Sequence, residues 1–471
     1  MAKKGGRWFG TGGWRAIIGD TFVADNIRLL SQAVADDMKA KEQQEIVLGY
    51  DRRFLSDKAA EWAAEVFAAN GITVFFINKF VPTPLVMFSV KERGTYYGMA
   101  ITASHNPFDY NGIKIFIKGG RDADVEVTDV FEDIIAKGTF PKYTAFDKAV
   151  ADGIIKLINP SNDYCDSILA NLDIDRIKSQ NMRVLLDPMY GVGKPTLNTI
   201  LSVCRVEMDT IHDSHDAYFG GKYPAPAPER LTELKEKVIA GRYDLGIALD
   251  GDADRIAVFD EVGRYISANE ILSLLYYYML QYKGLRGDVV RNLATTHILD
   301  RIAEDFGQKC HEVPVGFKWI SGKMDEADAL IGGESSGGLT IKGHIKGKDS
   351  VFASAMLVEM LAGSGQRIAG LLNEIEFKYG KMETAEFDVK FSAQKKAELM
   401  ALLFEEKKLP EYDIEVEKVN YLDGCKVYFK NGGWLIARFS GTEPLLRVFC
   451  EMSTLAEAKK YVDVTRKFLG L

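Results

Sequence analysis

The sequence predicts an α/β fold: three similar α/β domains with mixed sheets in tandem, then a C-terminal α+β domain, arranged around a central active-site cleft. Three observations predict it. The chain has 471 residues, too many for one hydrophobic core, and this length favours three or four domains. Three successive stretches show the same pattern: an apolar run typical of a buried strand, then a polar loop, then apolar residues at helical spacing. Beyond Gly380 this repeat gives way to a different order of strands and helices.

The first domain is predicted over residues 1–155. Residues 7–19 are rich in glycine and are expected to form a loop that could approach a phosphate. Helices are expected from residue 26 onward and over 58–70 and 127–135, and strands over 45–50, 72–77, 96–101 and 111–117. The polar stretch 143–161 is the expected link to the next domain.

The remaining domains are predicted over residues 156–262, 263–378 and 379–471. In the second we expect strands at 183–187, 207–211 and 244–249, helices at 195–204 and 230–240, and a hairpin at 256–266. In the third we expect helices at 268–281, 297–306, 350–361 and 366–374, strands at 288–293 and 329–331, and a loop at 315–318. The fourth is expected to hold a strand at 386–391, helices at 395–404 and 455–469, and strands near Val427 and Ile436.

The composition, with 47% apolar and 27% charged residues, is that of an ordinary globular protein. A net charge of −8 argues against nucleic acid or an anionic membrane as a partner. The longest apolar stretch, residues 271–280, is far shorter than the ~20 residues that span a bilayer. The N-terminal residues lack the apolar core of a secretory leader, and the five cysteines show no metal-ligand spacing. We therefore expect a cytoplasmic protein with reduced thiols.

Residues 102–107, Thr-Ala-Ser-His-Asn-Pro, follow the predicted strand 96–101 and contain a candidate nucleophile. A serine on a tight loop beside a histidine can attack an electrophile when a neighbouring base relieves it of its proton. On its own the hexapeptide is better explained as an Asn-Pro turn. Its functional interpretation depends on three further loops.

The loop 250–255, Asp-Gly-Asp-Ala-Asp-Arg, offers three carboxylates at alternate positions after a predicted buried strand. Hard divalent cations prefer such a set of oxygen ligands. A calcium-binding hand is the competing interpretation, because Glu261 falls at the twelfth position. However, Arg255 stands where that loop requires glycine, and strands rather than helices flank it. The pattern favours Mg²⁺, and a solvated acidic turn is the remaining alternative.

Two later loops offer groups for a polyol and for a phosphate. Glu334 and Ser336 supply an acceptor and a donor two residues apart, which suits neighbouring sugar hydroxyls, although an ordinary polar turn would look the same. Residues 438–444, Arg-Phe-Ser-Gly-Thr-Glu-Pro, with Arg447 close behind, combine a guanidinium, two hydroxyls and a glycine turn, as a dianionic phosphate requires. A helix-capping turn is an equal alternative for that motif. Lys318 alone would be interpreted as a surface lysine.

These four motifs, in this order and spacing, resemble those of the α-D-phosphohexomutase superfamily, and the resemblance covers essentially the whole chain. It implies three similar α/β domains and a C-terminal α+β domain around a central cleft. One difference is Gly12, where the N-terminal loop of the family usually has Asp or Ser. This difference affects the hydrogen bonds within the N-terminal loop and not the residues expected to carry out the reaction.

The resemblance also implies roles for individual residues. It identifies Ser104 as the serine that is phosphorylated in the resting enzyme, and Asp250, Asp252 and Asp254 as ligands of a Mg²⁺ ion shared with that phosphate. Glu334 and Ser336 become contacts to sugar hydroxyls. The implied site of the non-reacting phosphate holds Arg438, Ser440, Gly441 and Thr442, and Arg447 and Lys318 are further expected substrate contacts. Residues that match positions near the transferring phosphate are Arg15, Arg53, His105, Lys114 and Arg255. Of these, Arg53 and Arg255 are expected substrate contacts, and Arg15, His105 and Lys114 are expected to be catalytic.

The activity implied is a reversible transfer of phosphate between the 1- and 6-positions of a hexose, through a hexose 1,6-bisphosphate that also serves as activator. Lys114 acting with His105 is expected to supply the base. Residues 315–318, Val-Gly-Phe-Lys, resemble phosphoglucomutases and dual glucose/mannose enzymes, so glucose is the first expected sugar and mannose the second. We expect a monomer or homodimer.

Two functions of other classes fit part of the pattern. A phosphatase that forms a phosphoserine would explain Ser104 and the acidic loop, but not the separate phosphate loop near the C-terminus. A sugar-phosphate binding protein without activity would be expected to have lost Ser104 or one of the three aspartates, and all four are present.

Overall fold

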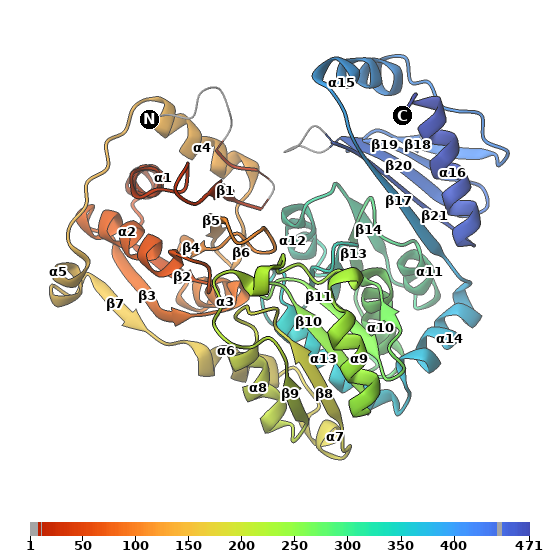
Figure 1. Ribbon diagram of the computed structural model, residues 1–471, viewed down its shortest axis with the longest axis horizontal. Coiled ribbons are helices and arrows are strands. Elements are labelled where there is room, and N and C mark those ends of the chain that lie inside the picture. The colour runs from red at the N-terminus through yellow and green to blue at the C-terminus, as the bar shows by residue number, and fades with distance from the viewer. Residues whose placement is uncertain (1–7, 11, 440–444) are drawn as a thin grey trace. The chain divides into compact units, whose positions relative to one another are not determined.

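The computed structural model describes residues 8–10, 12–439 and 445–471 (Figure 1). The chain divides into two compact units, Met1–Ile271 with Ser336–Ile368 and Leu272–Ser335 with Ala369–Leu471. Among the described residues, none of the helices combines the length and apolar character that crossing a membrane requires.

The first unit begins with a mixed sheet in the strand order β1-β5-β4-β2-β3-β7, with β6 paired to β5. Its strands are β1 (Trp14–Ile17), β2 (Glu45–Tyr50), β3 (Thr73–Phe80), β4 (Tyr97–Ile101), β5 (Tyr110–Ile117), β6 (Arg121–Asp122) and β7 (Ile155–Ile158). The neighbouring strands β4, β2, β3 and β7 are parallel to one another. Strand β5 is antiparallel to both of its neighbours, β4 and β1. β4 lies in the middle of this sheet, so the loop that follows it starts from a buried position.

Helices cover both faces of this sheet. Helices α1 (Ala24–Ala40), α2 (Ser56–Ala69) and α4 (Val125–Ala136) share one core with Leu48 and Met99. Helix α3 (Thr83–Arg93) packs on the other face, over Gly49 of β2 and Gly98 of β4. A Cβ atom at either glycine would lie within 2.5 Å of a valine methyl group of α3, so the helix can approach this closely only because both positions are glycine.

The second sheet of this unit has the order β12-β11-β10-β8-β9. Its strands are β8 (Arg183–Asp187), β9 (Glu207–Thr210), β10 (Leu245–Leu249), β11 (Ile256–Asp260) and β12 (Tyr265–Ile266). β8, β9 and β10 are parallel, and the sharp turn after β10 returns as antiparallel β11. The helices α8 (Lys194–Val203), α9 (Thr232–Gly241) and the almost entirely buried α13 (Ser350–Ser364) pack against it.

The first unit is completed by shorter elements. These are α5 (Phe146–Ala151), α6 (Ser161–Leu169), α7 (Ile174–Lys178), two short 3-10 turns (Phe219–Gly221 and Pro228–Arg230) and β16 (Leu339–Ile341). The chain passes from one unit to the other at three points: within α10 (Ala268–Gln281), between Ser335 and Ser336, and at the start of α14 (Ile368–Tyr379).

The second unit combines a parallel sheet with an antiparallel one. The parallel strands are β13 (Val289–Asn292), β14 (Cys310–Val313) and β15 (Ile331–Gly333), with helices α11 (Ile298–Asp305) and α12 (Phe317–Glu326). The antiparallel sheet has the order β17-β21-β20-β19-β18. Its elements are β17 (Glu383–Lys390), α15 (Ala393–Met400), a π-helical turn (Ala401–Glu405), β18 (Val416–Asn420), β19 (Cys425–Phe429), β20 (Trp434–Phe439), β21 (Leu445–Met452) and α16 (Leu455–Phe468). The predicted fold class, α/β domains with mixed sheets followed by a C-terminal α+β domain, is therefore confirmed.

Several observed elements differ from those predicted or were not predicted. Residues 14–17 of the predicted glycine-rich loop form β1, because Trp14 is buried and the segment pairs with β5. The predicted loop 315–318 ends early, since α12 begins at Phe317. Helix α3 was not predicted, because it is buried along eight successive residues and so shows no alternation of apolar and polar positions. The predicted domain boundaries stay predictions; β7, which pairs with β3, extends past residue 155.

Candidate active site

Ser104 lies on the loop that joins the central strand β4 to β5, and its side chain is buried. Its backbone has φ of 52°, a left-handed conformation that is uncommon for a residue other than glycine. The hydroxyl Oγ donates to Asp250 Oδ2 at 2.8 Å, and His105 Nδ1 lies 3.3 Å away. The strained backbone thus aims the hydroxyl at the acidic loop of the second sheet, as is common at functional sites.

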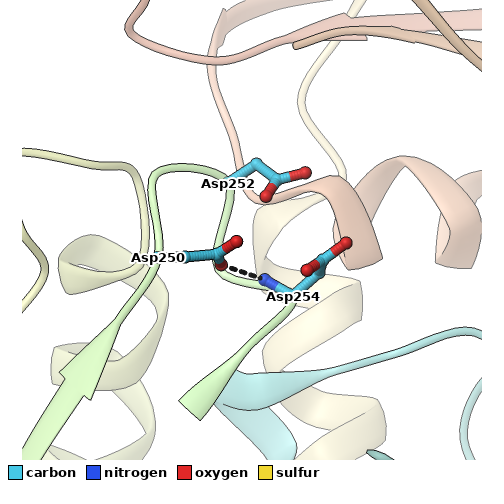
Figure 2. A group of neighbouring side chains, drawn as sticks. All are labelled: Asp250, Asp252 and Asp254. Atoms are coloured by element: carbon cyan, nitrogen blue, oxygen red, sulfur yellow. Dashed lines mark hydrogen bonds between the residues drawn. The ribbon is translucent and has the colours of Figure 1, made fainter. Parts of the chain in front are cut away.

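The acidic loop forms the tight turn between β10 and β11, and its three carboxylates point to the same side (Figure 2). One oxygen of Asp250, Oδ1, accepts hydrogen bonds from the backbone N–H groups of Asp254 and Arg255 at 2.9 and 3.0 Å. This contact curls the loop, so that carboxylate oxygens of Asp250, Asp252 and Asp254 lie within 4.8 Å of one another. All three side chains are buried.

These carboxylates fit a divalent cation. Within the described part of the chain, Asp252 Oδ1 and Asp254 Oδ1 are buried and accept no hydrogen bond. A buried carboxylate oxygen without a partner carries a large desolvation cost, which a bound cation would offset. Carboxylate oxygens are also the ligands that Mg²⁺ prefers. The residues present therefore suit Mg²⁺ at this loop.

Two lysines already offset part of the negative charge. The Lys114 ammonium on β5 donates to Asp252 Oδ2 and Asp254 Oδ2, both at 2.6 Å. Lys348, which precedes α13, places its ammonium 3.0 Å from Asp254 Oδ2. No sequence motif pointed to Lys348, because it lies 94 positions from Asp254 in the chain and the packing of α13 brings it here.

The pKa values follow from this arrangement. Burial, followed by the charges of Asp252 and Asp254, raises the pKa of Asp250. Burial also acts to raise the pKa of Asp254, but the charges of Lys114 and Lys348 hold it well below its usual value. For Lys114 burial acts to lower the pKa, and the two aspartates more than reverse this, so it stays an ammonium.

His105 and Arg15 complete the surroundings of the serine. Burial and then the charge of Arg255 lower the pKa of His105, so its imidazole is neutral beside Ser104. Arg15, on β1, donates from Nη1 to Asn106 Oδ1 at 2.5 Å, and burial with the charge of Arg255 lowers its pKa to about 10. The structure thus brings Ser104, His105, Arg15, Lys114 and the three aspartates together, as the sequence predicted for the reacting end of the site.

Two residues in the same surroundings have roles that sequence reasoning did not find. Thr83, at the start of α3, donates from Oγ1 to Asp252 Oδ2 at 2.6 Å, and its N–H donates to the Asp252 carbonyl at 3.0 Å. Arg53, predicted as a substrate contact, is buried, and both its Nη atoms donate to backbone carbonyls of the Ser104 loop. Arg53 therefore faces the protein backbone rather than open space.

The predicted sugar loop lies directly after β15. In the second unit, Asn292 Nδ2 donates to Glu334 Oε2 at 3.3 Å, and the N–H of Ser335 donates to Thr295 Oγ1 at 3.3 Å. The last residue of β13 thus holds Glu334, and the turn after β13 holds Ser335. Ser336, two residues further along, is exposed.

In the second unit, Arg438 pairs with Asp423 and Arg447 lies 3.7 Å from Asp388. Arg438 of β20 and Arg447 of β21 stand directly opposite each other, so their side chains share one face of the sheet. Asp423 Oδ2 accepts from Arg438 Nε and from the N–H of Val315, both at 2.9 Å. It thereby ties Arg438 to the segment that leads into Lys318, in the first turn of α12. Ser440, Gly441 and Thr442 lie outside the described residues.

Comparison with known proteins gives matches along nearly the whole chain. Residues 6–142, 162–263 and 267–379 match the families described as phosphoglucomutase/phosphomannomutase alpha/beta/alpha domains I, II and III, and residues 388–467 match the corresponding C-terminal domain. A protein named phosphoglucomutase/phosphomannomutase from Thermococcus kodakarensis is 30% identical over 98% of each chain. A phosphoglucosamine/phosphogalactosamine mutase from Sulfurisphaera tokodaii is 28% identical over 98% of this chain and 99% of its own. The crystal structure of a putative phosphomannomutase from Thermus thermophilus has a TM-score of 0.86 at 26% identity, covering 98% of this chain and 99% of the other.

Proposed function

The chain belongs to the phosphoglucomutase/phosphomannomutase family, and on that premise we propose that it interconverts glucose 1-phosphate and glucose 6-phosphate. Enzymes of this kind are phosphohexomutases, which are intramolecular phosphotransferases of the isomerase class. The contact between Ser104 Oγ and Asp250 carries the proposal, because it joins a nucleophile to a buried set of cation ligands. The free thiols of all five cysteines support the expectation of a reducing, cytoplasmic location.

In the proposed reaction, Ser104 carries a phosphoryl group in the resting enzyme. A hydroxyl of the bound hexose monophosphate attacks the phosphorus, the bond from phosphorus to Ser104 Oγ breaks, and a hexose 1,6-bisphosphate results. The intermediate then turns over, and its other phosphate returns to Ser104. The same bisphosphate, supplied from outside, phosphorylates an unmodified serine and so acts as activator.

Three groups of the first unit serve this transfer. His105 is the proposed acceptor for the proton of the attacking hydroxyl, because its Nδ1 lies 3.3 Å from Ser104 Oγ, which carries the phosphoryl group. Lys114 was expected to share that task, but its ammonium donates to two carboxylates, so we assign it to electrostatic support. Arg15, with Arg255 near it, orients the transferring phosphate.

Asp250, Asp252 and Asp254 would hold Mg²⁺ together with an oxygen on Ser104, and the ion would stabilise charge on the transferring group. The protein's own contribution is to keep these oxygens preorganised. The backbone bonds to Asp250 and the bond from Thr83 to Asp252 do this before any ligand binds.

The second unit supplies most of the proposed substrate contacts. Glu334 and, two residues along the same loop, Ser336 would bind sugar hydroxyls. Arg438 and Arg447 would bind the non-reacting phosphate together with residues 440–442. Arg438 and Arg447 stand opposite each other on one sheet face, each beside a carboxylate, and a dianionic phosphate would offer both guanidinium groups a further acceptor. Lys318 is a further proposed contact.

Replacing Asp423 with asparagine is expected to raise the KM for the sugar phosphate about threefold to tenfold, with kcat less affected. The change weakens the charge-assisted bond that orients Arg438 and the bond to the Val315 N–H. Steady-state kinetics on the purified variant measure this. Asp413→Asn, which removes an exposed carboxylate paired with Lys460, is the matched control. An unchanged KM in Asp423→Asn would mean that Asp423 does not orient the phosphate contact.

Glucose is the first proposed sugar and mannose the second. Residues 315–318 support this order, and the name of the Thermococcus relative covers both sugars. The names of other relatives include phosphoglucosamine mutase, so an amino sugar belongs in the test.

The deciding experiment is a coupled assay with Mg²⁺ and a trace of glucose 1,6-bisphosphate. The 1-phosphates of glucose, mannose and glucosamine are supplied in parallel, and formation of each 6-phosphate is measured. We expect the highest kcat/KM for glucose, followed by mannose. A higher value for mannose or glucosamine would reassign the substrate within the family. Release of inorganic phosphate without any 6-phosphate would favour a phosphatase, and binding without turnover would favour a sugar-phosphate binding protein.

A further inference from the structure

Arg53 is bound to the Ser104 loop through both terminal nitrogens of its guanidinium. Nη2 donates to the carbonyls of Ser104 at 2.5 Å and Asn106 at 2.7 Å, and Nη1 donates to those of Pro107 at 2.8 Å and Tyr110 at 3.0 Å. The side chain is fully buried. Four carbonyls within seven residues therefore converge on one planar cation, an arrangement that the single point charge of lysine cannot reproduce.

Asp51 supports the same loop from the other side. Its Oδ1 accepts from the Arg53 N–H at 3.0 Å and from Ser56 Oγ at 2.8 Å. Its Oδ2 accepts from Thr102 Oγ1 at 2.6 Å, and Thr102 Oγ1 in turn accepts from the Ser104 N–H at 2.9 Å. Arg53 Nε lies 3.5 Å from the same Oδ2. One buried ion pair thus binds the carbonyl of Ser104 directly, through Arg53, and its N–H indirectly, through Asp51 and Thr102.

The bound loop has little freedom at Ser104. The left-handed backbone of this serine is unfavourable in isolation, so the surrounding contacts must stabilise it. Its carbonyl oxygen also lies against Gly251, where an added Cβ would come within 2.8 Å. A change in the Ser104 backbone would therefore move the hydroxyl away from Asp250 or press the carbonyl against the acidic loop.

We propose that Arg53 is a positioning residue that, together with Asp51, holds the Ser104 loop in the conformation that presents Oγ to Asp250, and that it does not bind the substrate. The proposal rests on the proposed mutase function for its kinetic consequence only. The structural part of the proposal, that the guanidinium of Arg53 holds the Ser104 loop, does not depend on which sugar phosphate is the substrate.

The kinetic test compares Arg53→Met and Arg53→Lys with Arg52→Met. Both Arg53 variants are expected to lower kcat on the order of 10²-fold, because misplacing a nucleophile by about 1 Å has such an effect. KM for the sugar phosphate should stay within about twofold. Arg52 is the matched control: it is only partly buried, and its Nη1 donates to the Asp213 carbonyl. Arg52→Met should change neither constant by more than about twofold. A raised KM with unchanged kcat in the Arg53 variants would overturn the proposal and return Arg53 to the substrate contacts.

Two further measurements separate positioning from general stability. Guanidinium ion at millimolar concentration is expected to raise the kcat of Arg53→Ala at least about tenfold, by refilling the cavity, and to leave Arg52→Ala unchanged. Amide hydrogen exchange over residues 102–110 should be faster in Arg53→Lys than in the wild type, with the rest of the first sheet unchanged. Unchanged exchange in that segment would overturn the proposal, and the measurement stays decisive if Arg53→Met fails to fold. A wild-type chain that turns over no hexose phosphate would overturn the proposed function, whereas the exchange result would still test this inference.

Discussion

Ser104→Ala is expected to lower kcat by on the order of 10⁴-fold or more, because alanine has no oxygen to carry the phosphoryl group. Ser104 Oγ is the hydroxyl directed at Asp250, and another could take its place only if the loop were rebuilt. The measurements are kcat in the coupled assay and the mass of the protein after incubation with glucose 1,6-bisphosphate. The wild type should gain one phosphoryl group, and the variant none.

The control for this experiment is Ser202→Ala, which removes an exposed hydroxyl at the end of α8. It should retain full activity and the same phosphorylation. A Ser104→Ala protein with a native melting temperature and a kcat within about tenfold of the wild type would rule out a phosphoserine at this position. Phosphate found on Ser104 of the wild type without mutase activity would instead direct attention to the phosphatase alternative.

Asp252→Asn is expected to lower kcat by about 10²- to 10³-fold, the range seen when one electrostatic contact to a developing charge is lost. The substitution removes one of three negative charges from the loop and the carboxylate oxygen that accepts from both Lys114 and Thr83. The Mg²⁺ concentration that gives half-maximal activity should rise by at least about tenfold. Removal of metal with a chelator should abolish wild-type activity, and added Mg²⁺ should restore it.

A readout that does not depend on activity is the melting temperature. Mg²⁺ should raise it in the wild type, because an ion that binds only the folded chain stabilises that chain by mass action, and the rise should be much smaller in Asp252→Asn. Asp209→Asn is the matched control, as this carboxylate is exposed on β9 of the same sheet. An identical response to Mg²⁺ in wild type and Asp252→Asn would contradict a metal site at the acidic loop.

Sequence reasoning predicted the elements whose signals are local. The strands β2 and β10 and the helices α1, α10 and α16 show the apolar periods of their elements, and their observed positions follow those periods closely. The acidic loop could also be recognised, because three carboxylates separated by small residues curl a turn by themselves. The bonds from Asp254 and Arg255 N–H groups to Asp250 span only four and five positions. The apolar periods and the acidic turn both depend only on residues that are close together in the sequence.

Elements stabilised by distant partners were missed. β1 forms because Trp14 to Ile17 pair with a strand about a hundred residues later, and its glycine-rich surroundings give no strand signal. α3 is buried along most of its length, so the polar face that reveals a surface helix is absent. Arg53 was expected near a phosphate because it matches a position of the family that the sequence resembles. Its direction toward four carbonyls depends on how its loop meets residues 104–110.

By itself, then, the sequence determined the strands and helices that have a clear local period, the order of the chemically capable loops, and the residue types that each loop offers. Only the tertiary structure decided which of those groups meet. It brings Ser104 to Asp250 across 146 positions, Lys114 to Asp252 across 138, and Lys348 to Asp254, and it turns Arg53 inward. The physical reason is that periodicity and turn chemistry are set by adjacent residues, whereas these contacts depend on the packing of two sheets and on α13, which follows the acidic loop by about a hundred residues.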